Sequence, residues 1–219
     1  MTDRGHLHLP QPLDPEGPID PDSRSRLASA VDELAPTADT SHPTAFAAAV
    51  DHFDRHVDGW FEQVRGERWA DELFEAASRL GDWSLIWMLL NAAQGLSGPT
   101  GPERAVRNTA VLFMESVSVN QGIKSLFNRV RPEADPEVAG RIRRPTTSSF
   151  PSGHASAAFT AAGLLTAGHP ARKVPIYALA IVVSSSRIHT RMHHASDVVA
   201  GAAIGIGIAR AARRWWPAP

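Results

Sequence analysis

The segment SRIHTRMHHASD, residues 186–197, places arginine, histidine and aspartate side chains between two apolar runs at residues 174–183 and 198–208. Burying such groups is costly unless they satisfy one another or hold an anionic ligand. His193 and Asp197 are four residues apart, so on a helix they share a face, and Asp197 can then fix the tautomer of the imidazole. An oriented histidine near an arginine, here Arg187, suits attack on a phosphate. The segment predicts phosphate chemistry.

The apolar pattern around this segment predicts an all-α fold. Apolar residues recur at spacings of three and four over residues 43–64, which indicates an amphipathic helix. No strand pattern of any length appears. We expect a helical bundle with further helices at residues 69–80, 83–96, 103–127, 152–166, 174–186 and 198–210.

The same pattern divides the chain into three regions. Residues 1–43 are rich in proline, aspartate, serine and threonine and have little apolar periodicity. Such a segment cannot bury enough surface to offset its ordering entropy, so a disordered tail is expected. Residues 44–82 are expected to add amphipathic helices to a catalytic helical core formed by residues 83–212.

Composition excludes several classes of protein. The chain has 219 residues, a net charge of −1 and no cysteine. Nothing in this charge argues for nucleic-acid binding, and disulfides and thiolate metal sites are excluded. The mean hydropathy is −0.19, and no run of about 18 apolar residues marks a clean membrane span. Residues 1–10 lack the apolar core of a cleavable signal peptide. Hydropathy alone therefore favours a soluble protein.

A second motif, SFPSGH at residues 149–154, opens the helix expected at residues 152–166. Ser152 suits a helix N-cap, Gly153 permits close backbone approach, and free N–H groups at a helix start form an anion site. His154 beside a bound phosphate can protonate a leaving oxygen.

A third motif is Lys124, followed after six residues by Arg131 and Pro132. Two fixed cations can clamp phosphate oxygens, the arginine through its planar fork and the lysine as a point charge. Basic residues near a helix C-terminus also stabilise the macrodipole, which is the structural alternative. A rival for residues 186–197 takes His189, His193 and Asp197, at i, i+4 and i+8, as a metal-binding face.

Together the three motifs resemble the signature of the type 2 phosphatidic acid phosphatase superfamily. That superfamily includes lipid phosphate phosphatases, bacterial acid phosphatases and vanadium haloperoxidases. Its signature is Lys-x6-Arg-Pro, then Pro-Ser-Gly-His, then Ser-Arg-x5-His-x3-Asp, and all three parts occur here in order. The resemblance covers about residues 83–210 and is specific because the order and intervals match.

The resemblance implies a role for each matching residue. His193 would attack phosphorus to form a phosphohistidine, Asp197 would orient it, and His154 would act as general acid and then as base. The phosphoryl oxygens would be held by Lys124, Arg131, Ser152, Gly153 and Arg187. No metal or other cofactor is required by this scheme.

The resemblance also bears on location, because many members are multi-pass membrane enzymes. We expect a phosphatase in the cell membrane that acts on a phosphomonoester or diphosphate, namely a polyprenyl or phosphatidyl phosphate or a prenyl-linked sugar phosphate. The alternatives are a soluble cytoplasmic acid phosphatase, a vanadate-dependent haloperoxidase and a non-catalytic lipid- or anion-binding protein. Basic residues flank both ends of the expected helices, so the orientation in a membrane stays open.

Overall fold

The structure, a computed structural model, describes residues 44–133 and 144–218. The chain divides into two units, Met1–Thr44 and Ala45–Pro219, and all the helices named here belong to the second. The tail expected at residues 1–43 lies outside the described residues. So do two of the basic residues near the helix ends, Arg141 and Arg143.

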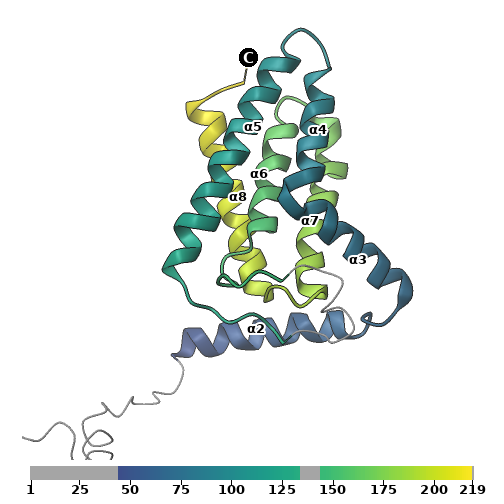
Figure 1. Cartoon of the computed structure of the whole chain (residues 1–219), viewed down its shortest axis with the longest axis vertical. Coiled ribbons are helices and arrows are strands. Elements are labelled where there is room, and N and C mark those ends of the chain that lie inside the picture. Colours follow the sequence, from purple (N-terminus) through teal and green to yellow (C-terminus); the bar gives the residue numbers. More distant parts are fainter. Residues whose placement is uncertain (1–43, 134–143, 219) are drawn as a thin grey trace, which may run out of the picture. The chain divides into compact units, whose positions relative to one another are not determined.

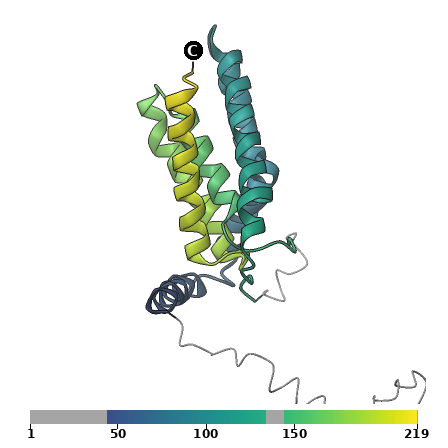
Figure 2. The ribbon, with the colours of Figure 1, turned by 90° about the vertical axis from the view of Figure 1, so that its left-hand side faces the viewer.

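Every regular element in the described part is a helix, so the prediction of an all-α fold is confirmed. The α-helices are α2 (Ala45–Glu62), α3 (Arg68–Gly81), α4 (Leu85–Gly95), α5 (Gly101–Val117), α6 (Gly153–Leu165), α7 (Lys173–His189) and α8 (Ala195–Trp215). Helices α4 to α8 run along one common direction, whereas α2 lies across one end of the bundle (Figures 1 and 2).

Helix α6 forms the centre of the bundle, in contact with α4, α5, α7 and α8. Its alanines and glycines let neighbouring backbones approach closely. A Cβ at Gly201 or Gly205 of α8 would collide with the carbonyl oxygen of Ser152 or Ser156. The start of α6 is therefore fixed tightly against α8, and this contact positions the second motif beside the third.

The expectation of one continuous helix over residues 103–127 is wrong in its last third. Helix α5 ends at Val117 and continues as a π-helix, η2 (Ser118–Gly122), and then as a 3₁₀ helix, η3 (Ile123–Leu126). A π-turn holds one extra residue, so the residues after it are rotated by about 100° relative to a continuous α-helix. This rotation sets the direction in which Lys124 leaves the chain.

Helix α7 runs further than expected and α8 starts earlier, so residues 190–194 form a tight turn between them. Its backbone bends through Arg191, which has a φ of 51°. His193 therefore lies in this turn and not on a helix, and the assumption that it shares a helical face with Asp197 is wrong. The two side chains nevertheless lie close together, because the turn leads directly into α8.

Helix α8 is the described helix that is long and apolar enough to cross a membrane by length and composition, with a mean hydropathy of 1.4. A third of that apolar stretch is buried inside the bundle. Many large apolar side chains on the other helices are exposed, among them Leu89, Val106, Phe113, Val174 and Ile181.

Candidate active site

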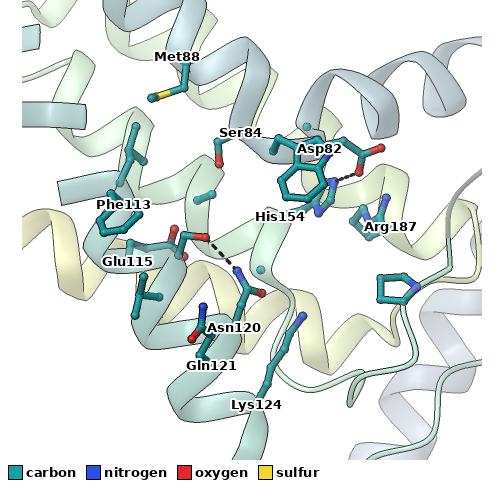
Figure 3. Close-up of a pocket in the computed structure, with 18 of the residues that line it drawn as sticks. Asp82, Ser84, Met88, Phe113, Glu115, Asn120, Gln121, Lys124, His154 and Arg187 are labelled. Carbon is teal, nitrogen blue, oxygen red and sulfur yellow. Dashed lines mark hydrogen bonds and ion pairs between the residues drawn. The ribbon is translucent and has the colours of Figure 1, made fainter. Parts of the chain in front are cut away.

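The three motifs meet at a cavity of about 570 Å³, and Figure 3 shows the side chains that line it. Figure 3 shows Lys124 reaching from η3 into the space bordered by His154 and Arg187. Six of the eight residues expected at the site line this cavity, namely Lys124, Arg131, Gly153, His154, Arg187 and His193. Segments far apart in the sequence thus supply one site.

His193 is held by the backbone of the turn and is only 3% exposed. The backbone N–H groups of His193 and Met192 both donate to the backbone carbonyl oxygen of Arg187, each at 3.0 Å. The ring Nε2 lies 3.4 Å from Nη1 of Arg131. Burial lowers the pKa of His193 to about 3, and the positive charges of Arg187, Arg131 and Lys124 add to this effect. The imidazole is therefore neutral at physiological pH, as a nucleophile must be.

Asp197 stands behind His193 and is fully buried. Its Oδ2 lies 3.7 Å from His193 Nδ1, longer than a hydrogen bond, and accepts the backbone N–H of His194 at 2.9 Å. Its backbone carbonyl accepts the N–H of Ser152 at 3.0 Å, which ties the second motif to the third. The carboxylate is thus fixed in position to hold the imidazole once that ring becomes charged.

His154 is paired with a residue that the sequence did not point to. Its Nε2 lies 3.0 Å from Oδ1 of Asp82, at the junction of α3 and the following 3₁₀ turn (Figure 3). A Cβ at Gly81 would come within 2.6 Å of the His154 ring, so glycine is needed there. No motif in the sequence links Asp82 to His154, which is 72 residues away.

Three cationic side chains converge on the cavity. Lys124 and Arg187 are buried, and Arg131 donates to the carbonyl oxygen of Met192 at 2.7 Å. Arg187 donates to the hydroxyl of Ser78, while its Nε has no hydrogen-bond partner among the described residues. Burial, with Arg131 and Arg187 nearby, lowers the pKa of Lys124 to about 8. Mutually repelling cations around one cavity are the arrangement that an anionic phosphoryl group stabilises.

Ser152 and Gly153 lie at the start of α6, as expected. Ser152 is the N-cap, and its hydroxyl accepts the N–H of Ala155 at 3.4 Å. Ser152 is buried and does not line the cavity, whereas Gly153 does. A Cβ at Gly153 would come 2.6 Å from Oδ1 of Asn120. The part of both residues in phosphate binding stays a prediction.

The alternative metal face is not assembled. His189 pairs with Asp71 of α3, with 2.8 Å between Nε2 and Oδ1. The described residues contain no group of three or more His, Cys, Asp or Glu side chains placed to hold a metal ion. His189 therefore anchors α7 to α3.

Sequence reasoning also missed Arg129 and Asp54. The guanidinium of Arg129 bridges Asp197, at 2.6 Å, and Asp54 of α2, at 2.7 Å. One signal was available, because Asp54 is a carboxylate between Val50 and Val57 on the apolar face of an amphipathic helix. A charge in that position indicates a buried partner.

Comparison with known proteins identifies the family of this chain. A family model of the PAP2 superfamily matches residues 106–219. The chain belongs to the PAP2 superfamily. It is 33% identical over 128 residues to decaprenylphosphoryl-5-phosphoribose phosphatase of Mycolicibacterium smegmatis, covering 58% of this chain and 68% of the relative. The Mycobacterium tuberculosis enzyme of the same name is 31% identical over 129 residues, with 70% of it covered.

Two solved PAP2-type structures share the fold. A transmembrane phosphatidylglycerolphosphate phosphatase from Bacillus subtilis has a TM-score of 0.55 at 19% identity, over 87% of this chain and 90% of its own. LpxE of Aquifex aeolicus also has a TM-score of 0.55, at 24% identity, over 72% of this chain and 94% of its own. The predicted superfamily, its helical fold and the phosphatase class are thereby confirmed. Helices α2 and α3 precede the matched residues 106–219.

Proposed function

We propose that this PAP2 phosphatase hydrolyses a polyprenyl-type lipid phosphate in a membrane, through a phosphohistidine on His193. The observation that carries the proposal is a buried imidazole in the same cavity as three cations, with a second histidine on the cavity wall. A nucleophile, an anion cradle and a proton donor are the three parts that phosphoryl transfer through a covalent intermediate needs.

In the first half-reaction, Lys124, Arg131 and Arg187 hold the oxygens of the phosphoryl group. Nε2 of His193 attacks phosphorus, and the bond from phosphorus to the leaving oxygen breaks as the new N–P bond forms. His154 enters this step protonated and gives its proton to the leaving oxygen. Burial and the charge of Arg187 lower the pKa of His154 to about 4 in the free enzyme, so His154 takes up this proton when the anionic substrate binds beside it. The imidazole becomes cationic in this step, and the carboxylate of Asp197 near Nδ1 stabilises that charge.

In the second half-reaction, His154 is neutral and accepts a proton from an attacking water. The water oxygen bonds to phosphorus, the N–P bond breaks, and inorganic phosphate leaves. Asp82 is paired with His154 and keeps its ring in place through both halves. Each residue thereby returns to its starting protonation state.

The rim of the cavity supports a lipid substrate. Trp83, Met88, Leu112, Phe113 and Val117 line it beside the polar residues, and Trp83 and Phe113 are exposed. Apolar side chains around a phosphoryl cradle fit a phosphate carried on a hydrocarbon chain. The named relatives act on a decaprenyl-linked phosphoribose. We take a prenyl-linked sugar phosphate as the preferred substrate class.

The membrane location rests on the exposed apolar side chains of the bundle and on α8. Exposed leucine, valine and phenylalanine side chains on α4, α5 and α7 are costly in water and suit lipid. We propose a multi-pass protein in the cell membrane, with the bundle inserted and the cavity at one membrane face.

Hydrolysis in the presence of EDTA tests this function. Detergent-extracted wild-type protein is compared with His193→Ala on an aryl phosphate and on a prenyl-linked sugar phosphate. We expect wild-type activity to persist in EDTA, to favour the prenyl substrate, and to fall by about 10⁴-fold or more in the variant. A rapidly quenched wild-type reaction should also contain acid-labile phosphate on the protein. Activity that survives in His193→Ala would contradict the mechanism.

A further inference from the structure

Asp54 of α2 is a buried carboxylate outside the residues that the superfamily model matches. Its Oδ1 accepts the backbone N–H of Ser196 at 2.7 Å. Its Oδ2 accepts the Ser196 hydroxyl at 2.8 Å and Arg129 Nη2 at 2.7 Å. A carboxylate that is 6% exposed and makes three such bonds fixes the first turn of α8 against α2.

Arg129 carries this constraint to the catalytic aspartate. Its Nη1 donates to the Ser196 hydroxyl at 2.7 Å and to Asp197 Oδ1 at 2.6 Å. One rigid, planar guanidinium therefore spans a carboxylate of α2 and the carboxylate that faces His193. If Asp54 lost its charge, Arg129 would keep a single carboxylate partner, and its guanidinium group could rotate.

The outer surface of α2 carries three aromatic residues at intervals of seven. Phe46, Phe53 and Trp60 are 79%, 42% and 58% exposed. Residues seven apart on an α-helix differ by only about 20° in direction, so the three form one stripe. The stripe borders the apolar face through which Val57 and Phe61 pack on the bundle.

A lipid surface is the partner that fits this stripe. Helix α2 lies across the end of the bundle (Figures 1 and 2), and the helices above it expose apolar side chains along their sides. An amphipathic helix in this orientation, with tryptophan and phenylalanine on one edge, suits the headgroup region beside an inserted bundle.

We infer that α2 lies in the membrane interface through Phe46, Phe53 and Trp60, and positions Asp197 through Asp54 and Arg129. The inference rests on the proposed function and adds a positioning residue and a docking surface to it. Asp54 does not line the cavity, so it acts through Asp197.

The positioning role is tested with Asp54→Asn, which keeps the size of the side chain. Its matched control is Asp51→Asn, an exposed carboxylate on the same helix. We expect kcat on a soluble aryl phosphate to fall about 10- to 100-fold in Asp54→Asn with KM nearly unchanged, because the cations of the cavity stay in place. Asp51→Asn should match the wild type.

A double variant separates positioning from general loosening of the fold. In an Asp197→Asn background, Asp54→Asn should cost little further activity, since its target is already removed. Equal losses in both backgrounds would overturn the positioning role. The melting temperature of each variant is measured in parallel, and Asp54→Glu serves as the conservative variant if Asp54→Asn does not fold.

The docking role is tested with Phe53→Ser/Trp60→Ser on the full chain. We expect KM for a lipid phosphate in phospholipid vesicles to rise several-fold while activity on the aryl phosphate is unchanged. His52→Ser, on the polar side of α2, is the control. An equal loss on both substrates, or no loss on vesicles, would overturn the docking surface.

Failure of the proposed phosphatase function can be distinguished from failure of the inference about α2. A wild-type protein that hydrolyses neither substrate contradicts that function but leaves the docking testable by fluorescence. The emission of Trp60 is the difference between the spectra of the reconstituted wild type and of Trp60→Phe, and brominated phospholipids should quench this difference. A difference spectrum that brominated phospholipids leave unquenched would overturn the interfacial placement of α2 whatever the activity.

Discussion

At the scale of single residues, the chemistry depends on the division of labour between the two histidines. Burial and the nearby cations lower the pKa of His193, so its imidazole is neutral. His193 lies in a turn that is stabilised by two hydrogen bonds to the carbonyl oxygen of Arg187. His154 lies at the start of α6, with Asp82 as its partner. In the proposed mechanism the first attacks phosphorus and the second exchanges protons with the leaving group.

This division predicts a dependence on the leaving group. In His154→Gln, hydrolysis of an alkyl phosphate should fall by about 10²- to 10⁴-fold, because an alkoxide needs a proton to leave. Hydrolysis of 4-nitrophenyl phosphate should fall much less, since nitrophenolate leaves unprotonated. The values of kcat/KM on both substrates check this, because kcat/KM reports the first half-reaction and not the later attack of water, and His193→Gln should lose both equally. Equal losses in His154→Gln would contradict the general-acid role.

The lowered pKa of Lys124 predicts an alkaline limit to activity. In the free enzyme the lysine loses its proton as the pH rises through about 8, and with it the charge that attracts phosphate. The profile of kcat/KM against pH should therefore fall above about pH 8, where a phosphomonoester is already fully ionised. In Lys124→Arg this fall should move to higher pH. An unchanged alkaline limb in that variant would assign the limit to another group.

At the scale of elements, the sequence predicted the helices well and their ends poorly. Apolar spacing placed every long helix, because each buries one face in the bundle. It could not predict the π-turn after α5 or the turn that carries His193, because both arise from packing around the cavity. The motif residues were found by type and spacing. Asp82 is far from them in the sequence, and Arg129, although it lies between Lys124 and Arg131, is not a fixed position of the motif and meets Asp197 only in the folded chain.

The π-turn at Ser118–Gly122 predicts the effect of a deletion. Removing Ser118 should let α5 continue as an α-helix and turn Lys124 by about 100° away from the cavity. We expect kcat/KM on an aryl phosphate to fall roughly tenfold to a hundredfold, the value of one charged hydrogen bond. Ser118→Ala keeps the chain length and should be neutral. Full activity in the deletion variant would show that the π-turn does not direct Lys124.

The contact between α6 and α8 predicts that glycine-to-alanine substitutions at two positions of α8 have opposite effects on stability. A Cβ at Gly205 would collide with the Ser156 carbonyl and lie 3.0 Å from the Thr160 nitrogen, whereas one at Gly207 would meet nothing within 4 Å. Gly205→Ala should destabilise the protein by about 1–3 kcal/mol and lower its melting temperature. Gly207→Ala should be neutral or slightly stabilising, because alanine favours a helix. Similar melting temperatures for the two would contradict the close packing.

At the scale of the whole molecule, hydropathy and structure point in different directions. A mean hydropathy of −0.19 reflects the polar residues of the whole sequence, whereas the folded bundle exposes apolar side chains on its sides. The polar residues of α5 turn inward instead, where Asn108 donates to Asn91 at 3.1 Å. A sequence average cannot distinguish the outside of a helix from its inside.

This arrangement predicts how the protein fractionates. In the proposed membrane location the apolar sides contact lipid, so the protein should stay in the membrane pellet after washing with alkaline carbonate and enter solution only with detergent. The wash removes proteins that are held only by charge. Release of active protein by carbonate alone would instead support the soluble alternative.

The bridge from α2 to α8 also has a consequence for biosynthesis. Asp54 is 75 residues from Arg129 and 142 residues from Ser196 along the chain. Contacts between such distant segments form late, because the intervening chain must be made and folded first. Asp197 lies in the first turn of α8, the final helix described, so its ion pair with Arg129 forms only after α8 has been made. Under the proposed mechanism a partly synthesised chain that ends before residue 193 lacks the nucleophile, and we expect hydrolysis to begin only once α8 has packed against α2.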